Sequence, residues 1–466
     1  MSHPSTFPVT PPRAAISIAR RELLLFFCVV WFCYGLFISV VDLEFYTLQQ
    51  AGVEAIVEHG TYRLGLSSVE LLQPRGDVFT FNGYILAAKQ PGQFTLAALP
   101  YFVFSRFGIT YASNYDLAAA LVTWCSATLL SALGCLCFHL LVRQVWGLRT
   151  NVAYALTLLY GFGTILFPYA GVLHHDTIAA AYLMISFYLL EKVSTQQSAR
   201  PLLLTSVAGV LVGLTIFTSM LPAPVVVVFT FYLLFSKNVM RILGYFAGVV
   251  IGLLPLFAYN LHYFGGIWTQ ANVAGDFADT FIRLDWTTFT QNLWTYLGWG
   301  DLSVYKYMPI LVVAWVGAWL FPAHLRRQQF WLISAPLFQV AYILNIGTIG
   351  HCQYGPRYLI PVVPFVMAGL AGWFLRQEVS WISHSRLALL ELAGGYSLLI
   401  NLVGAISGTP FCGTQDFTVL KILETFVIQG VGVGIGPFPL WPVCLAALAL
   451  LGIGVAMQRR VDATDQ

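Results

Sequence analysis

The sequence from Glu22 to Val41, ELLLFFCVVWFCYGLFISVV, is followed at once by Asp42-Leu43-Glu44. About 20 apolar residues are enough to cross the roughly 30 Å hydrocarbon layer of a bilayer, so this stretch is expected to form a membrane-spanning helix. Two carboxylates then lie at the membrane boundary, where the loss of hydration makes the ionised form costly. We therefore expect Asp42 and Glu44 to begin a functional loop rather than an ordinary connection.

The composition agrees with a protein built from many such helices. Of the 466 residues, 58% are hydrophobic and only 9% are charged. Soluble domains contain about 25% charged residues, so we expect an all-α, multi-pass membrane protein. The net charge of +3 is small and the basic residues are scattered, which argues against nucleic acid as a partner.

Apolar runs of spanning length recur along the chain. We expect about twelve transmembrane helices, in a range of about eleven to thirteen, because several runs are short and Pro222 and Pro224 interrupt one region. The runs are 22–41, 116–142, 151–168, 177–192, 201–219, 222–236, 242–260, 306–322, 328–346, 358–375, 387–406 and 437–457.

The basic residues predict which side of the membrane each connection faces. Cytoplasmic connections of membrane proteins are enriched in Lys and Arg, and with twelve spans every inner connection of this chain is basic. We therefore expect a cytoplasmic N-terminal segment (1–21), a single transmembrane domain (22–457) and a cytoplasmic tail (458–466). The longer loops, such as 42–115, then face outward, to the periplasm, the cell exterior or a lumen. The basic residues are Arg13, Arg20, Arg21, Arg143, Arg149, Lys192, Arg200, Lys237, Arg241, Arg326, Arg327, Arg376, Arg386, Arg459 and Arg460.

The first outer loop, 42–115, has predicted structure of its own. From Tyr46 to Leu64, apolar and polar residues alternate with helical period, which predicts an amphipathic helix on the membrane surface. Asn82-Gly83 is a strong signal for the tight turn of a hairpin. Phe94 to Phe107 is apolar but short, and we expect a second surface helix or a re-entrant helix there.

Asp42 and Glu44 are the first candidates for chemistry. A carboxylate in a partly desolvated pocket is a good general base for a hydroxyl group, because burial raises its proton affinity. The alternative is a solvated end of the first helix. Asp42 is the preferred base because it lies where the span is expected to end.

The segment after the hairpin turn, Lys89-Gln90-Pro91-Gly92-Gln93, is a candidate binding site. Pro91 and Gly92 restrict the backbone, while Lys89 and Gln93 can bind an anion or hydroxyl groups. Tyr84, just after the turn, is a further candidate for substrate binding. An ordinary hairpin followed by the start of a helix is the alternative.

His174-His175-Asp176 precedes another span. The run could hold a metal, but adjacent histidines rarely bind one ion, and no further histidines cluster with them in the sequence. We favour His175 and Asp176 as substrate-binding groups, with Asp176 as a second carboxylate of the site. The alternative is that Asp176 only caps the next helix.

A late polar stretch runs from Gly350 to Tyr358, GHCQYGPRY. Arg357 lies at the mouth of a span, and a guanidinium binds phosphate through two parallel hydrogen bonds. We expect Arg357 to bind phosphate, with His351, Tyr354 and Tyr358 contacting the substrate. The alternative is that Arg357 only extends to the membrane interface.

Together these motifs resemble the GT-C superfamily of integral-membrane glycosyltransferases, in particular bacterial relatives of protein O-mannosyltransferases and of the lipid A aminoarabinose transferase. The matching parts are an acidic residue after the first span and a surface helix ending in Glu58-His59-Gly60-Thr61. Three further segments match in order: NGYILAAKQPGQ (82–93), YGFGTILFPY (160–169) and YGPRYL (354–359).

The resemblance implies a sugar transfer from a polyprenyl-phosphate donor to a lipid, glycan or protein acceptor on the outer face. It assigns the role of base or acceptor-positioning group to Asp42, although Leu43 separates Asp42 from Glu44 where relatives have an adjacent Asp-Glu pair. Lys89 and Arg357 would neutralise the donor phosphate, so no metal or other cofactor is expected. The competing interpretation is a transporter or flippase of lipid-linked sugars, which would favour ionisable groups in mid-span and inverted repeats.

Overall fold

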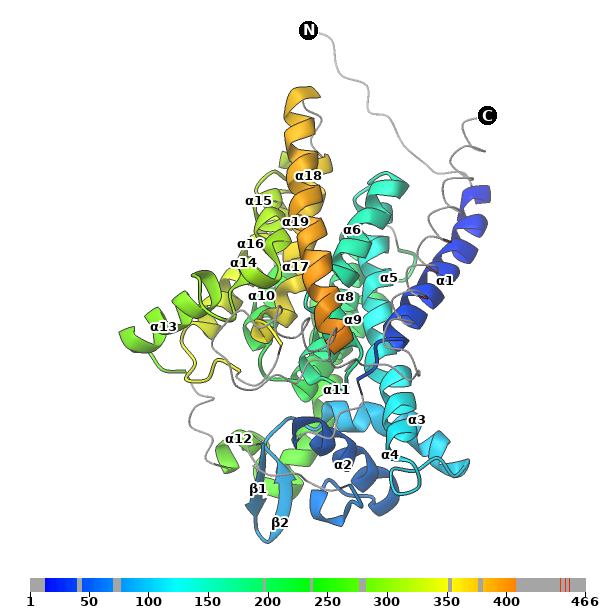
Figure 1. Ribbon diagram of the computed structural model, residues 1–466, viewed down its shortest axis with the longest axis vertical. Coiled ribbons are helices and arrows are strands. Elements are labelled where there is room, and N and C mark those ends of the chain that lie inside the picture. Colours follow the sequence, from blue (N-terminus) through cyan, green and yellow to red (C-terminus); the bar gives the residue numbers. More distant parts are fainter. Residues whose placement is uncertain are drawn as a thin grey trace, which may run out of the picture.

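The chain folds into a bundle of helices, with a small two-stranded sheet at one end (Figure 1). This computed structural model describes residues 13–39, 44–69, 77–195, 198–234, 238–275, 282–350, 354–375 and 380–407, with single residues near 445–452. Asp42, His351 and the expected last span, 437–457, therefore lie outside the described residues, apart from isolated positions in the span.

Long helices form the body of the bundle, as the apolar runs predict. Every predicted run from the first to 387–406 has a helical counterpart. The helices of the body are α1 (Arg13–Gly35), α4 (Tyr115–Thr123), α5 (Leu129–Leu140), α6 (Thr150–Phe162), α7 (Leu166–Ala170), α8 (His175–Ser194), α9 (Pro201–Thr218), α10 (Ala223–Leu234), α11 (Val239–Phe264), α14 (Val304–Tyr307), α15 (Pro309–Ala318), α16 (Arg326–Ile343), η6 (Arg357–Val362), α17 (Val363–Ala368), α18 (Gly372–Leu375) and α19 (Ser380–Ser407).

The predicted count of about twelve spans is not confirmed. Among the described residues, six helical segments are long and apolar enough to cross a membrane. A seventh is obtained if α15 and the helical segment Ala323–Ile343, bent by 102° relative to each other, count as one broken span. Two further runs form shorter helices: α10 has 12 residues, and α6 has 13. The count of about twelve complete crossings therefore stays a prediction.

The first helix also ends earlier than expected. We predicted a span to Val41, but α1 ends at Gly35, and a turn follows at Leu36 and Phe37. A Cβ atom on Gly35 would lie 2.5 Å from the indole nitrogen of Trp124, so a larger residue would collide with this neighbour. The chain beyond the turn runs along another segment, where the Ser39 amide donates to the Gly171 carbonyl at 2.9 Å. These tertiary contacts replace the last helical turn.

The first outer loop contains the predicted elements in the predicted order. They are α2 (Glu44–His59), a hairpin of β1 (Val78–Phe81) and β2 (Tyr84–Ala87), and α3 (Gly92–Arg106). Asn82 and Gly83 have positive φ angles of 50° and 80°, as the tight turn requires, so the hairpin prediction is confirmed. The helix α2 does not simply lie on a surface, because Thr47 to Ala55 are buried.

The hairpin is attached to the end of α11 by aromatic packing. Phe79 and Phe81 contact the ring of Phe264, with ring centroids 6.2 and 5.5 Å apart. The hydroxyl of Tyr263 accepts a hydrogen bond from the Tyr62 amide at 3.0 Å. The rigid end of α11 therefore positions the hairpin and the segment that follows it.

Candidate functional site

A polar pocket of about 130 Å³ lies where the hairpin, the start of α8 and the start of η6 meet. These segments are far apart in the sequence, and only the folded chain brings them together. The pocket also includes the turn after α9 and the short helix α12 (Ala271–Ala274). Its lining residues are Ala88, Lys89, Gln90, His175, Asp176, Thr218, Ser219, Met220, Leu221, Asn272, Tyr342, Ile346, Thr348, Arg357 and Tyr358.

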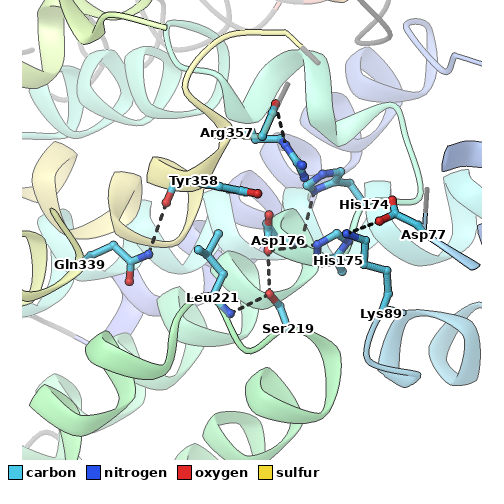
Figure 2. A network of polar contacts seen from close by, with 11 residues as sticks. Asp77, Lys89, His174, His175, Asp176, Ser219, Leu221, Gln339, Arg357 and Tyr358 are labelled. Atoms are coloured by element: carbon cyan, nitrogen blue, oxygen red, sulfur yellow. Dashed lines mark hydrogen bonds and ion pairs between the residues drawn. The ribbon is translucent and has the colours of Figure 1, made fainter. Parts of the chain in front are cut away.

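Lys89 provides one of the positive charges of the pocket. The strand pairing continues beyond β2, because the Ala88 amide donates to the Asp77 carbonyl at 2.8 Å. This arrangement places Lys89 opposite Asp77, and the ammonium lies 3.0 Å from the carboxylate (Figure 2). Burial favours the neutral acid, but Lys89, with Arg357 and His175 beyond it, outweighs burial and lowers the pKa of Asp77. Asp77 is therefore an anion at the edge of the site.

Arg357 provides the second positive charge. The residue is only 7% exposed, and among the described residues its guanidinium donates one hydrogen bond, from Nε to the Gly350 carbonyl at 3.4 Å. The ring of Tyr358 lies 4.8 Å from the guanidinium carbon. Gly350 has a φ angle of +71°, and a Cβ atom there would lie 2.8 Å from Nε of Arg357. Glycine at this position thus allows both the turn and the close approach of Arg357.

Asp176 is the buried carboxylate of the site. The Ser219 hydroxyl donates to its Oδ1 at 2.7 Å, and Nε2 of His175 lies 3.5 Å from the same oxygen. The second oxygen, Oδ2, has no hydrogen-bond partner in the described part of the chain. An anionic oxygen that is buried without a donor is costly. Because Asp176 lines the pocket, Oδ2 is available to a ligand hydroxyl or a water molecule.

The first turn of α8 is capped by His174 and not by Asp176. Nδ1 of His174 accepts a hydrogen bond from the Asp176 amide at 3.2 Å, which leaves the Asp176 carboxylate available to the pocket. Potential ligand atoms of His174, His175 and Asp176 all lie within 4.8 Å of one another. One of the three side chains thus already has a structural role as a cap.

A second, apolar cavity of about 250 Å³ lies close to the polar pocket. The two lining sets have no residue in common, but α16 and η6 contribute to both: Tyr342 and Tyr358 line the polar cavity, while Val340 and Leu359 line the apolar one. The apolar lining consists of Leu297, Val304, Tyr305, Leu311, Val312, Trp315, Pro336, Leu337, Val340, Leu359, Val362 and Val366. A ligand with a charged head and a hydrocarbon tail would match this pair of cavities.

The structure brings together five of the residues predicted from the sequence. Lys89, His175, Asp176, Arg357 and Tyr358 all line the polar pocket. In the sequence, His175, Asp176, Arg357 and Tyr358 adjoin apolar runs, whereas Lys89 follows the turn of the predicted hairpin.

Three other predicted residues lie outside the pocket lining. Gln93 is completely buried at the start of α3, and its amide atoms have no partner among the described residues. Tyr84 stacks under Arg63, whose guanidinium carbon lies 3.6 Å from the ring centre. The Tyr354 hydroxyl donates to the Ile400 carbonyl at 2.7 Å, which is a structural role. Glu44 begins α2, whereas Asp42 and His351 are not described.

Several lining residues escaped sequence analysis, among them Gln90, Ser219, Asn272 and Tyr342. Ser219 lies in the turn between two apolar runs, where a lone serine is an ordinary turn residue. Asn272 and Tyr342 belong to no motif of the sequence. The only available signal was for Gln90, which lies between Lys89 and Pro91 in the segment already identified.

The sequence matches no known protein family and no characterised protein closely enough to identify it. The fold does match solved structures. Apo ArnT from Cupriavidus metallidurans superimposes with a TM-score of 0.53 at 15% identity, over 95% of this chain and 76% of ArnT. ArnT bound to undecaprenyl phosphate gives a TM-score of 0.50 at 15% identity, over 96% of this chain and 77% of ArnT. This chain has a GT-C fold. ArnT, the lipid A aminoarabinose transferase, is itself a GT-C glycosyltransferase.

The GT-C fold agrees with the resemblance found in the sequence motifs. At 15% identity the likeness concerns the fold, so the activity of this chain has to be argued from its own pocket.

Proposed function

We propose that the chain is a membrane glycosyltransferase that takes a sugar from a polyprenyl-phosphate donor and passes it to a lipid, glycan or protein acceptor. The observation that carries this proposal is the meeting of Lys89 and Arg357 at one polar pocket beside an apolar cavity. Two cations suit a phosphate group, and the apolar cavity suits the first isoprene units attached to it.

The chemistry follows from the charges. The bond between the sugar C1 and the phosphate oxygen breaks, the bond between C1 and the acceptor oxygen forms, and the acceptor loses its proton to a carboxylate base. Lys89 and Arg357 stabilise the negative charge that develops on the departing phosphate. Asp42 remains the proposed base, with Glu44 as the alternative. Direct displacement by the acceptor inverts the configuration at C1.

Asp176 and His175 are proposed to bind the sugar or the acceptor. Oδ2 of Asp176 can accept a hydrogen bond from a hydroxyl group, while Ser219 fixes the other oxygen. We propose that no metal takes part, because Lys89 and Arg357 already supply positive charge where the leaving group would lie. Transfer should then persist in excess EDTA, and a loss that added Mg²⁺ or Mn²⁺ restores would reject a metal-free mechanism.

The proposed site faces the periplasm or the exterior, and both termini face the cytoplasm. This orientation rests on the basic inner connections of the sequence. Cysteine substitutions at Ser67 and at Ser198, followed by labelling of intact cells with a membrane-impermeant maleimide, test it. Labelling at Ser67 alone is expected, and labelling at Ser198 alone would reverse the orientation.

The central experiment measures transfer from a radiolabelled polyprenyl-phosphate sugar by the purified protein. Replacing Lys89 or Arg357 by Ala should lower the rate by about 10²- to 10³-fold, as expected when a group that stabilises developing charge is removed. Arg106→Ala removes an exposed cation at the end of α3 and is the matched control. If both pocket variants retain full transfer, the assignment of the phosphate site is wrong.

Transport of lipid-linked sugars is the alternative function. In reconstituted vesicles, a labelled donor lipid that crosses the bilayer without any transfer of sugar would favour a flippase.

A further inference from the structure

A carboxylate outside the pocket lining pairs with Lys89, one of the two cations proposed to bind the donor phosphate. Asp77 lies 3.0 Å from the Lys89 ammonium, and its charge also acts on Arg357 and His175. Its side chain is 30% exposed, compared with 22% for Lys89, so the pair lies at the edge of the pocket and not in the core. Figure 2 shows Asp77, His175 and Lys89 side by side.

Lys89 and Arg357 are the cationic side chains of the pocket, and Asp77 is the carboxylate paired with Lys89. A phosphate oxygen that accepted a hydrogen bond from the Lys89 ammonium would therefore lie within roughly 6 Å of the Asp77 carboxylate, two hydrogen-bond lengths away. At this distance the two anions repel each other appreciably.

The proposed reaction changes the charge of the phosphate. The donor is a phosphodiester with a single negative charge. Its product, the free polyprenyl phosphate, is a monoester with a second pKa near 6, so its charge is about −1.5 to −2 at pH 7. A fixed carboxylate beside the binding cation repels the product more strongly than the donor.

We infer that Asp77 is a specificity-determining residue that makes the pocket favour the phosphodiester donor over the phosphomonoester product, and so promotes product release. This inference rests on the proposed function. Asp77 is not proposed to contact the reacting atoms. It limits the positive charge that Lys89 offers to a ligand.

The test measures binding of two ligands to the purified full chain: farnesyl phosphate, a monoester, and its methyl ester, a diester. Asp77→Asn removes the charge and keeps the size of the side chain. Because Coulomb repulsion grows with ligand charge, this variant should tighten diester binding about fourfold and monoester binding more than about tenfold. Inhibition of transfer by farnesyl phosphate should strengthen in parallel.

Two further variants control for folding and for general charge effects. Asp77→Glu keeps the carboxylate and should keep the wild-type preference for the diester. Asp285→Asn removes a fully exposed carboxylate that caps α13 (Trp286–Leu297) outside the pocket lining, and it should change neither affinity. Equal tightening of both ligands in Asp77→Asn, or no tightening, overturns the role of Asp77 and leaves the proposed function intact. If the wild-type chain binds neither ligand, the proposed phosphate site is wrong, and the role of Asp77 is wrong with it.

Discussion

The helix α8 carries a buried carboxylate near each of its ends, Asp176 and Glu191, and the two have opposite surroundings. They are separated by about 22 Å along the helix axis, and both residues are completely buried. Glu191 accepts a hydrogen bond on each of its two oxygens, from the Tyr232 hydroxyl and from the Gln328 amide at 2.9 Å. Asp176 has one oxygen held by Ser219 and a second oxygen without a partner among the described residues.

This contrast separates a structural carboxylate from one that is available to a ligand. Around Glu191, three helices supply the carboxylate and both donors, so nothing remains for a ligand to bind. Around Asp176, the free oxygen lies at a pocket that also contains Lys89 and Arg357. Burial alone does not distinguish the two carboxylates, whereas the number of satisfied oxygens does.

The largest effect on transfer is expected for a substitution of Asp176. Asp176→Asn preserves the size of the side chain but removes the charge and one acceptor oxygen. We expect transfer to fall about 10²-fold, with a change in unfolding free energy of less than about 1 kcal/mol. Steady-state kinetics and thermal unfolding of the same preparation measure both quantities. A variant that loses stability but keeps its activity would mean that Asp176 is structural, like Glu191.

The opposite pattern is expected at the Glu191 end. Glu191→Ala leaves the Tyr232 hydroxyl and the Gln328 amide buried without their acceptor, which should cost about 2–4 kcal/mol of stability. Activity per folded molecule should stay within about twofold of wild type, since nothing in this cluster lines the polar pocket. Glu191→Gln keeps an acceptor in place and should lose less stability. A large loss of activity at unchanged stability would show that the two ends are coupled.

A smaller effect is expected at Ser219, which holds Asp176 in place. Ser219→Ala removes the hydrogen bond to Oδ1 and should lower transfer about threefold to tenfold, with a stability cost of about 1 kcal/mol. Ser186→Ala is the matched control, because this buried hydroxyl donates to the Ala208 carbonyl within the same bundle. Both variants should lose similar stability, but only Ser219→Ala should lose activity. Equal activities in the two variants would mean that Ser219 does not contribute to the function of the site.

The sequence predicted the Asp176 end better than the Glu191 end, for a physical reason. Asp176 and Arg357 are charged groups beside apolar runs, where an ionised side chain loses hydration, and Lys89 follows the turn of a predicted hairpin. Glu191 also ends an apolar run, but its neighbour Lys192 made it resemble an ordinary cytoplasmic connection. Its partners lie 41 and 137 residues further along the chain, so only the fold reveals that it is buried and satisfied.

The fold, like the candidate site, was predictable only in part from the sequence. Asn82-Gly83 specified the hairpin locally, because few residues other than these tolerate positive φ angles. The end of α1 depends instead on contacts such as that between Gly35 and Trp124, which no local pattern reports. Tertiary packing decided where the apolar helices stop.

The smallest effect on transfer is expected for the hydroxyl of Tyr232. Tyr232→Phe removes one donor from Glu191 but keeps the ring, over which the Arg327 guanidinium lies at 3.8 Å. The loss of one buried hydrogen bond should cost about 1–2 kcal/mol of stability and leave transfer unchanged. Combined with Glu191→Gln, the substitution should cost less than the sum of the two single changes, because the two side chains share one interaction. Additive costs would mean that the hydroxyl and the carboxylate stabilise the protein independently, and the closed cluster at this end of α8 would then be an incorrect description.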